Sequence, residues 1–272
     1  MSALPADLRP STALDLHLHT SASDGRYDLD EVLRRCARGG LDVVAITDHD
    51  LARHLQTGPV EVEGRTLHVI AGAEVSGVHE GREHHLLVYF PARVPDGFVD
   101  FCSAQCDARR TRFEDAMRAL AVDLPTPPDA RALTRLHLAR ALVEAGVVEA
   151  TADAFVRHLG DAHGFVPRLT LPFVEAIRIA RAFGGITSWA HPPRVAVEAH
   201  LSTFVSAGLQ GLELVRPNVP AADRKALKKL ARRQGLFLTG GSDWHGWTGP
   251  EPGLFRVDAA RIAGFVDALR AA

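Results

Sequence analysis

The feature that most constrains the fold is a repeated alternation between short apolar runs and longer segments with helical periodicity. The run DVVAIT at 42–47 is compact and apolar, as expected of a buried parallel strand. The segment before it, 29–37, places its apolar residues on one helical face and stops at Gly39-Gly40. This alternation predicts an α/β fold in which helices cover a parallel sheet, either open or closed as a barrel.

The predicted elements follow this order along the chain, with one interruption. Strands are predicted over 13–18, 42–47, 67–71, 85–90, 186–190, 211–215 and 236–239, and helices over 29–37, 171–183, 197–207, 221–234 and 259–269. Between 101 and 159 the pattern is helical without strand signals, and Pro125, Pro127 and Pro128 interrupt it. We therefore predict a core formed by 1–100 and 166–272, with a helical insertion over 101–165 that caps the substrate site.

Composition and charge limit the partners. A chain of 272 residues with 46% hydrophobic content can bury a large core. The formal net charge is -2 and no long basic run occurs, which argues against duplex DNA as a partner. Small anions, or one end of a nucleic acid, stay compatible with this charge, because bound metal ions supply local positive charge. No apolar run has the length of a membrane span or a signal peptide, so no membrane partner is expected.

The cysteines bear on the compartment. Cys36, Cys102 and Cys106 are few and odd in number, which argues against a disulfide framework and favours a reducing cytoplasm. Cys102 and Cys106 would share one helix face. They are either small apolar residues of that face, which we favour, or half of a thiolate metal site.

Histidine and acidic residues gather where the predicted strands end. His17 and His19 are two apart on the first strand, so both imidazoles can face one ion. The other candidates are Asp24, Asp48, His49, Asp50, Glu74, His84, His85, His191, Asp243 and His245. Most follow a predicted parallel strand, at the edge where α/β folds form their sites. Imidazole and carboxylate ligands together suit zinc, manganese or iron. The number of candidate ligands exceeds the three or four protein ligands of one catalytic ion, so we predict a cluster of two or three ions.

At this point the chain resembles the polymerase-and-histidinol-phosphatase (PHP) superfamily of metal-dependent phosphoesterases. The matching segments, in the family's order over 15–246, are DLHLHTSASDG, AITDHD, GAE, HHLLVYF, WAHP and GSDWHG. The segment TRLHLARALVEAGVV resembles the branch that acts on nucleotide monophosphates, 3′,5′-bisphosphonucleotides and short RNA 5′ ends. The resemblance implies an α/β fold of the distorted (β/α)7 barrel type with a trinuclear metal site.

The resemblance also implies a ligand set. It assigns one ion to His17, His19, Glu74 and Asp243, a second to Glu74 as a bridge with His85 and His191, and a third to Asp24, His49 and His245. We choose His85 over its neighbour His84, because it matches the histidine that opens this strand in the family motif. We expect manganese ahead of iron or zinc.

Substrate contacts are predicted from basic residues near these motifs. The resemblance brings Arg135 and His137, in TRLHLAR, into the site, with Arg135 gripping a second phosphate through two hydrogen bonds. Arg194, after WAHPP, is a further candidate, and Arg109 and Arg112 are weaker ones. Each could instead be part of a solvated basic face.

Three more residues have two interpretations each. Trp244 and Trp247 could stack on a base, or pack beneath their loop, which we favour. Asp48 could orient the imidazole of His49 or cap the loop.

These observations predict an enzyme that hydrolyses phosphomonoesters of nucleotides, AMP-like or 3′,5′-bisphosphonucleotides, with a metal-activated hydroxide held by the ligand set. The alternatives are a 5′-3′ exoribonuclease on short RNA, a histidinol-phosphatase-like or other small-molecule phosphatase, and a non-catalytic metal-binding module. The TRLHLAR segment argues against histidinol phosphate, and the filled ligand positions argue against a non-catalytic module. Arg216, Asn218 and Pro193 differ from the residues common in the branch, which leaves the exact substrate open.

Overall fold

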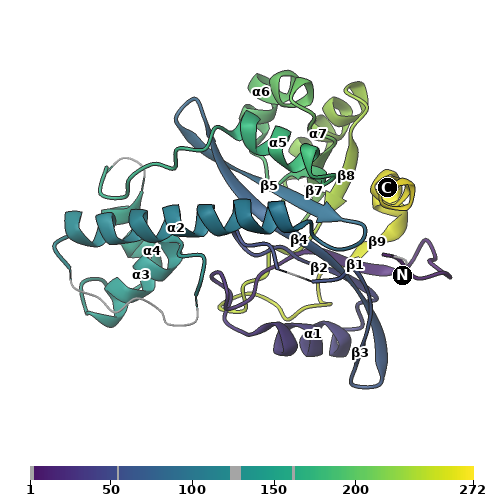
Figure 1. Cartoon of the computed structure of the whole chain (residues 1–272), viewed down its shortest axis with the longest axis horizontal. Coiled ribbons are helices and arrows are strands. Elements are labelled where there is room, and N and C mark those ends of the chain that lie inside the picture. Colours follow the sequence, from purple (N-terminus) through teal and green to yellow (C-terminus); the bar gives the residue numbers. More distant parts are fainter. Residues whose placement is uncertain (1–2, 54, 123–129, 161–162) are drawn as a thin grey trace.

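A computed structural model describes residues 3–53, 55–122, 130–160 and 163–272 (Figure 1). Its strands are β1 (Ala13–Leu18), β2 (Val43–Ile46), β3 (Gly58–Val62), β4 (Arg65–His79), β5 (Arg82–Phe90), β6 (Ile186–Trp189), β7 (Gly211–Val215), β8 (Phe237–Gly240) and β9 (Val257–Asp258). Its helices are α1 (Leu29–Arg38), α2 (Asp96–Ala119), α3 (Arg135–Glu144), α4 (Thr151–Ala154), the π-helix η1 (Phe155–Leu159), α5 (Phe173–Ala182), α6 (Arg194–Ser206), α7 (Ala221–Arg233), the 3-10 helix η2 (Ala259–Ile262) and α8 (Ala263–Ala271). Pro125, Pro127 and Pro128, which interrupt the predicted helical pattern, lie outside the described residues.

The nine strands of the described residues belong to one sheet with the order β8-β7-β6-β5-β4-β2-β1-β9, and β3 pairs with β4 at its side. The pairs β1–β2, β2–β4, β6–β7 and β7–β8 are parallel. The expectation of a parallel sheet is wrong for β5, which runs antiparallel to both β4 and β6. A direct hairpin turn joins β4 to β5, and such a turn can connect only antiparallel strands.

The β3–β4 hairpin is a further difference from the predicted elements. Glu63 and Gly64 form its two-residue turn, and both have positive φ, at 50° and 77°. Such turns match the twist of paired strands and are usually marked by Asn-Gly or Asp-Gly, so Glu-Gly gave a weak signal here. The middle residues of β3 are exposed, which also removes the apolar alternation that would mark a strand.

The two ends of the sheet approach each other and nearly close it into a barrel. The segment after β8 meets β1: Ser242 donates its backbone N–H and its hydroxyl to the carboxylate of Asp15, at 2.9 and 2.6 Å. Leu18 also forms a parallel bridge to Trp244. The chain therefore has the expected distorted α/β barrel, with a mixed sheet and apolar residues such as Leu16 and Tyr89 buried inside it.

Apolar clusters divide the helices between the barrel and a separate group. Phe98 and Cys102, in the first half of α2, pack with α5 and α6 against the sheet. Phe113, in the second half of α2, packs instead with Leu138 and Leu142 of α3. Figure 1 shows α2 reaching from the barrel to this second group of helices. The helical stretch thus begins at Asp96, earlier than residue 101.

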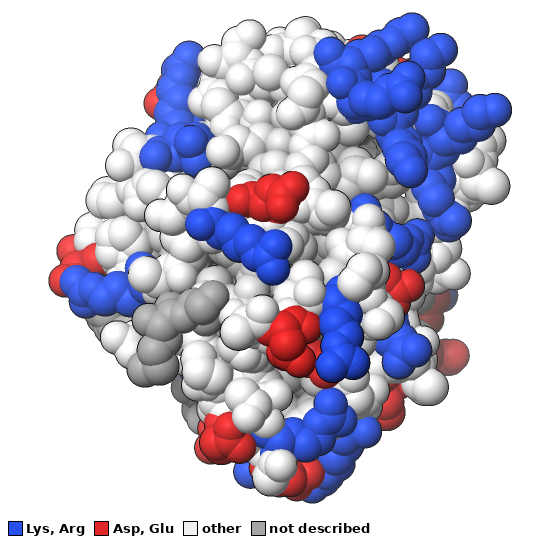
Figure 2. Space-filling view, turned by 90° about the vertical axis from the view of Figure 1, so that its right-hand side faces the viewer, with Lys and Arg blue, Asp and Glu red and all other residues white. Residues whose placement is uncertain are grey.

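Charge is mixed over the surface. Figure 2 shows acidic and basic side chains interspersed on one face, with Lys and Arg gathered near its upper right edge, at the height of α6 and α7 in Figure 1. Helix α7 exposes Arg224, Lys225, Lys228, Lys229, Arg232 and Arg233. None of the described helices combines the length and hydropathy that a membrane span requires.

The cysteines lie in apolar surroundings. All three are free and buried, and Cys102 belongs to the main core cluster. Cys106 donates its thiol to the backbone carbonyl of Asp50 at 3.3 Å. Among the described residues, no group with metal-ligand geometry includes a cysteine, so the apolar interpretation of Cys102 and Cys106 fits the structure.

Candidate metal centre

Strand geometry positions the residues of the centre. His17 lies in β1 and His19 directly after it, so the alternation of the strand directs both rings to one side. The expectation that Glu74 follows a strand is wrong, because β4 continues through Glu74 to His79. His85 lies in the first half of β5, which begins at Arg82, and the antiparallel direction of β5 brings this part of the strand close to the carboxyl ends of the parallel strands. A histidine in the first half of an antiparallel strand therefore joins histidines near the ends of parallel strands.

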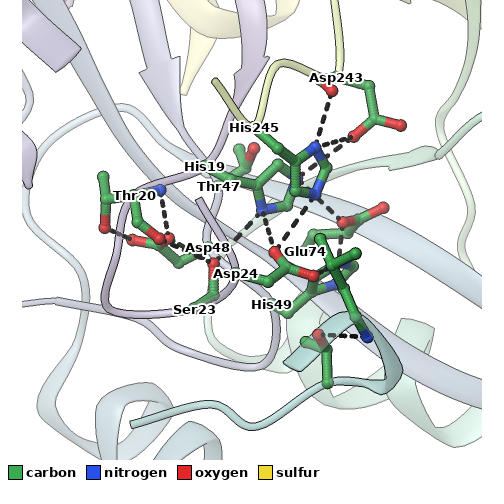
Figure 3. A network of polar contacts seen from close by, with 12 residues as sticks. His19, Thr20, Ser23, Asp24, Thr47, Asp48, His49, Glu74, Asp243 and His245 are labelled. Carbon is green, nitrogen blue, oxygen red and sulfur yellow. Dashed lines mark hydrogen bonds and ion pairs between the residues drawn. The ribbon is translucent and has the colours of Figure 1, made fainter. Parts of the chain in front are cut away.

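The structure brings all of the predicted ligand residues together. Figure 3 shows part of this cluster, with His19, Asp24, His49, Glu74, Asp243 and His245. The ligand atoms lie within 4.8 Å of one another in three overlapping groups: His17, His19, Glu74 and Asp243; His19, Asp24, His49 and His245; and His49, Glu74 and His85. His191 completes the set, with Nε2 at 2.9 Å from Oε1 of Glu74 and 3.3 Å from Nδ1 of His85. The groups share residues, so the centre is one continuous cluster.

Glu74 lies at the middle of this cluster. Its side chain is fully buried, and imidazole nitrogens surround both of its oxygens. These are Nε2 of His17 (3.3 Å), Nε2 of His19 (3.4 Å), Nδ1 of His49 (3.0 Å), Nδ1 of His85 (3.1 Å) and Nε2 of His191 (2.9 Å). A carboxylate surrounded in this way has the position expected of a bridge between ions.

The charges of the cluster depend strongly on each other. Burial would raise the pKa of Glu74, but His49, His17 and His85 outweigh it and hold that pKa well below its usual value. Burial would lower the pKa of His85, but Glu74 and Glu83 raise it to about 10. In the same way Asp24 raises the pKa of His245 to about 9 against the effect of burial. Without metal, imidazolium ions would compensate the buried carboxylates.

Several polar atoms of the cluster have no hydrogen-bond partner among the described residues. They are Nε2 of His17, Nε2 of His19, Nδ1 of His49, Oδ1 of Asp24 and Oε2 of Glu74. Buried polar groups are nearly always hydrogen-bonded, and leaving them unpaired costs about 1–3 kcal/mol each. These nitrogen and oxygen atoms point at one another without hydrogen-bond geometry, as ligands around a cation do. The residues present therefore fit divalent metal ions.

Glu213 is a functional candidate that the sequence interpretation missed. It lies in the middle of β7, fully buried, and accepts a hydrogen bond from Nδ1 of His17 at 2.9 Å. Its other oxygen accepts from the backbone N–H of His191 at 2.7 Å. The hydrogen bond at Nδ1 leaves Nε2 of His17 to face Glu74. An acidic residue within the apolar strand GLELV was the available signal, because buried carboxylates require partners.

Asp48 caps the loop after β1. It accepts from the backbone N–H of Thr20 at 2.7 Å, from the Thr20 hydroxyl at 2.8 Å and from the Ser23 hydroxyl at 2.6 Å (Figure 3). The hydroxyl of Ser23 lies 3.5 Å from Nδ1 of His19. Of the two interpretations of Asp48, the structure supports loop capping. Asp48 also acts on an imidazole indirectly, because Ser23 contacts the ring of His19, and this ring is not the expected one of His49.

A cavity of about 270 Å³ opens beside the cluster. Its lining combines cluster residues with residues from α2, α3 and η1: Asp24, His49, Glu83, His85, Arg109, Arg112, Thr134, Arg135, Leu136, Phe155 and His245. Arg112 donates to Glu83 at 3.1 Å, and the guanidinium of Arg135 lies 3.7 Å from the same carboxylate. The cavity is thus basic on the side formed by the helices.

The other predicted substrate residues make contacts within the protein. His137 accepts the backbone N–H of Thr134 through Nδ1 at 3.1 Å and caps α3, and it does not line the cavity. Arg194 begins α6 at the surface, where it pairs with Glu198 at 2.8 Å and Asp223 at 3.4 Å. Arg109 is buried against Asp50 at 2.6 Å, so its charge is already compensated.

The two tryptophans pack beneath their loop. Trp244 is buried and stacks on Tyr27, with ring centroids 5.8 Å apart. Trp247 donates its indole N–H to the backbone carbonyl of Asp24 at 2.7 Å, and Arg140 lies over its ring. Neither residue lines the cavity, so the packing interpretation fits both.

His84 points away from the cluster. Successive residues of β5 face opposite sides, so Glu83 and His85 face the cavity while His84 contacts Phe173 and Trp189, with ring centroids 5.4 and 5.3 Å away. The choice of His85 over His84 as a ligand agrees with this geometry.

Comparisons with known proteins identify the family. The model of the PHP domain matches residues 15–109. A 5′-3′ exoribonuclease of Haemophilus influenzae is 30% identical over 261 residues, which cover 90% of this chain and 95% of the relative. A phosphoribosyl 1,2-cyclic phosphate 1,2-diphosphodiesterase of Eggerthella lenta is 29% identical over 260 residues, 90% of this chain and 99% of the relative. A 3′,5′-nucleoside bisphosphate phosphatase of Chromobacterium violaceum is 27% identical over 251 residues, 85% of this chain and 87% of the relative.

A solved structure shows the same fold. A protein from Bifidobacterium adolescentis superposes with a TM-score of 0.75 at 24% identity, covering 97% of each chain. The family model, the barrel and the Haemophilus influenzae relative, which is 30% identical, agree with the order of the motifs. The chain belongs to the PHP family.

Proposed function

We propose that this chain is a metal-dependent phosphoric ester hydrolase that acts on nucleotide phosphomonoesters, either AMP-like or 3′,5′-bisphosphonucleotides. The observation that carries the proposal is the basic cavity directly beside the metal-ligand cluster. His85 and His245 of the cluster and Arg112 and Arg135 of the helices line the same cavity. A substrate with two anionic groups could place one at the ions and the other at the arginines.

The cluster is proposed to hold divalent ions, three in number and manganese by preference, through His17, His19, Asp24, His49, Glu74, His85, His191, Asp243 and His245. Bound divalent ions lower the pKa of a coordinated water and neutralise charge that develops on phosphoryl oxygens. The chain contributes the arrangement of the donors: Glu213 fixes the ring of His17, and Asp48 with Ser23 holds the loop that carries Asp24.

The helical side of the cavity is proposed to recognise the rest of the substrate. Glu83 pairs with Arg112 and lies near Arg135, which holds both guanidinium groups at the cavity wall. Guanidinium groups bind phosphate through two parallel hydrogen bonds. Phe155 of η1 offers an apolar ring on the same wall, on which a base could stack.

Hydrolysis of short RNA from its 5′ end is a second candidate function. A relative with this name shares 30% of its residues over nearly the whole chain. The same two anionic contacts would serve a 5′-terminal nucleotide, because neighbouring phosphates flank its ribose. The formal net charge of -2 favours short RNA over long nucleic acids. Histidinol phosphate and other small phosphate esters are the remaining alternatives, and phosphoribosyl 1,2-cyclic phosphate is added by the Eggerthella lenta relative.

A substrate panel tests the proposal. The purified protein with manganese is assayed for kcat/KM on 3′,5′-bisphosphoadenosine, AMP, a 5′-phosphorylated tetraribonucleotide, histidinol phosphate and phosphoribosyl 1,2-cyclic phosphate. We expect the highest kcat/KM on the bisphosphonucleotide or AMP. A higher value on the tetraribonucleotide would favour the exoribonuclease, and a higher value on either of the last two would contradict a nucleotide substrate.

A further inference from the structure

A second group of metal-ligand side chains lies outside the centre, where the β4–β5 hairpin approaches α6 (Figure 1). His79 ends β4, Glu80 lies in the turn and His200 lies on α6, and their ligand atoms are within 4.8 Å of one another. We propose that His79, Glu80 and His200 form a separate binding site for a divalent transition-metal ion, which ties the hairpin to α6. This site goes beyond the proposed function and does not depend on it.

The distances suit an ion after a small movement. Nε2 of His79 is 4.0 Å from Oε1 of Glu80, and Nε2 of His200 is 3.9 Å from Oε2 of the same carboxylate. Ligands about 2.0–2.2 Å from a tetrahedral zinc ion lie about 3.4 Å from each other. The Glu80 side chain is 70% exposed and can rotate, whereas those of His79 and His200 are only 22% and 16% exposed. Movement of the exposed carboxylate would shorten both of its distances to the imidazole nitrogens.

The surrounding rings hold the two imidazoles in place. The His79 and His200 rings are 4.8 Å apart and nearly perpendicular. Phe204 of α6 packs edge-on against His79 at 5.0 Å and lies 6.0 Å from His200. Rings fixed by apolar packing lose little freedom when they bind an ion, which favours binding. Two imidazoles with one carboxylate and no thiolate suit zinc, nickel or copper rather than magnesium or calcium.

His84 gives an independent indication of a ligand at this place. It is 6% exposed, and its Nε2 has no hydrogen-bond partner among the described residues. Its ring lies 6.3 Å from that of His200. A buried imidazole nitrogen without a partner is unusual, and an ion or an ion-bound water in the neighbouring site would supply one.

The site is separate from the proposed catalytic centre. His84 and His85 face opposite sides of β5, so His85 belongs to the central cluster and His84 to the side of α6. An ion at His79 and His200 would therefore not touch the substrate cavity. It would hold the hairpin whose strands carry Glu74 and His85, and so support the centre from its outer side.

Zinc binding to the full chain tests this proposal. Equilibrium dialysis against Zn²⁺, with the bound metal counted by mass spectrometry, compares the wild type with Glu80→Gln and His200→Ala. His163→Ala is the matched control, because this histidine is exposed and its ring contacts the carbonyl of Val156 and the ring of Phe165, away from the proposed site. We expect His200→Ala to bind one ion per chain fewer than the wild type, Glu80→Gln to bind that ion more weakly, and the control to be unchanged.

Equal zinc stoichiometry and affinity in the wild type and both site variants would overturn the proposal. Glu80→Gln keeps the test valid if His200→Ala fails to fold, because Glu80 is exposed and its replacement is isosteric. A second measurement needs no variant: crystals soaked in Zn²⁺ should show zinc anomalous density between His79 and His200. Density at the central cluster without density between these two residues would also overturn the site.

Discussion

The carboxylate of Glu213 accepts a hydrogen bond from Nδ1 of His17 at 2.9 Å, across 196 residues of sequence. Both side chains are fully buried, and the pair joins β7 to β1 within the barrel. Because this bond fixes the ring, Nε2 of His17 points to Glu74 and Asp243 at 3.3 Å each. A residue that no motif marks thus orients one of the central proposed ligands.

Replacing Glu213 tests this relationship. Glu213→Gln keeps the shape but removes the charge that raises the basicity of His17. Loss of such an outer partner typically lowers metal affinity about 10- to 100-fold. We expect manganese activation of phosphate release to require that much more metal, with kcat nearly restored at saturation. Glu198→Gln, at an exposed position of α6, is the control, and an unchanged activation curve for Glu213→Gln would contradict the orienting role.

Arg135 provides a test of substrate recognition. Its guanidinium lines the cavity beside the cluster. A hydrogen bond to a charged group contributes about 1.5–3 kcal/mol, so Arg135→Ala should raise KM for 3′,5′-bisphosphoadenosine about 10- to 100-fold. Steady-state kinetics give the answer, with Arg118→Ala on the exposed side of α2 as control. An unchanged KM would show that the second anionic group binds elsewhere.

The Asp50–Arg109 pair predicts a change in stability. Arg109 donates to Asp50 at 2.6 Å and to the hydroxyl of Ser76 at 2.7 Å, and all of these groups are buried. Arg109→Ala leaves the Asp50 carboxylate buried and uncompensated, which should lower the free energy of unfolding by about 3–5 kcal/mol. Urea denaturation measures this loss. A loss as small as that of a surface substitution, within about 0.5 kcal/mol, would show that the pair is not important for stability.

Metal uptake should depend on pH. In the metal-free protein the pKa values of His85 and His245 are raised to about 10 and about 9, so both rings carry a proton at pH 8. Each ring must lose that proton before it binds an ion, so metal binding releases protons and becomes tighter as the pH rises toward 9–10. Isothermal titration with Mn²⁺ in buffers of different ionisation enthalpy counts the released protons. Uptake at pH 8 without proton release would contradict these raised pKa values.

Much of this molecule follows from local sequence signals. The helix predicted over 29–37 is marked by its apolar spacing and the following Gly39-Gly40, and the structure places α1 at Leu29–Arg38. Most of the predicted ligands converge because the ends of parallel strands share one edge, and this rule needs no knowledge of the pairing. Glu74 and His85 are exceptions, because they lie within β4 and β5. The structure brings His17 and His245 into one cluster, as predicted from their positions at the end of the first strand and after the last one.

Other features depend on contacts that no single segment reveals. The antiparallel direction of β5 is set by the Glu80-Gly81 turn. Glu80 has a positive φ of 47° there, and glutamate is not a residue type from which a positive φ is predicted. Glu213 acts through a partner on another strand, so only the fold shows its role. His137 caps its own helix instead of lining the cavity, because its Nδ1 reaches the backbone of Thr134. Arg194 forms ion pairs at the surface with Glu198 of α6 and Asp223 of α7.

The most direct test of a metal-dependent phosphoesterase is phosphate release from 3′,5′-bisphosphoadenosine by three samples: the protein with manganese, the protein stripped by chelation, and a His17→Ala, His19→Ala double variant with manganese. We predict rapid release by the first and at least about a thousandfold slower release by the other two. The metal ions and their ligands act as one unit, so the loss of either should remove most of the activity. Circular dichroism would confirm that the variant remains folded. Equal release by the stripped protein or by the folded double variant would contradict the assignment of the cluster as the centre of catalysis.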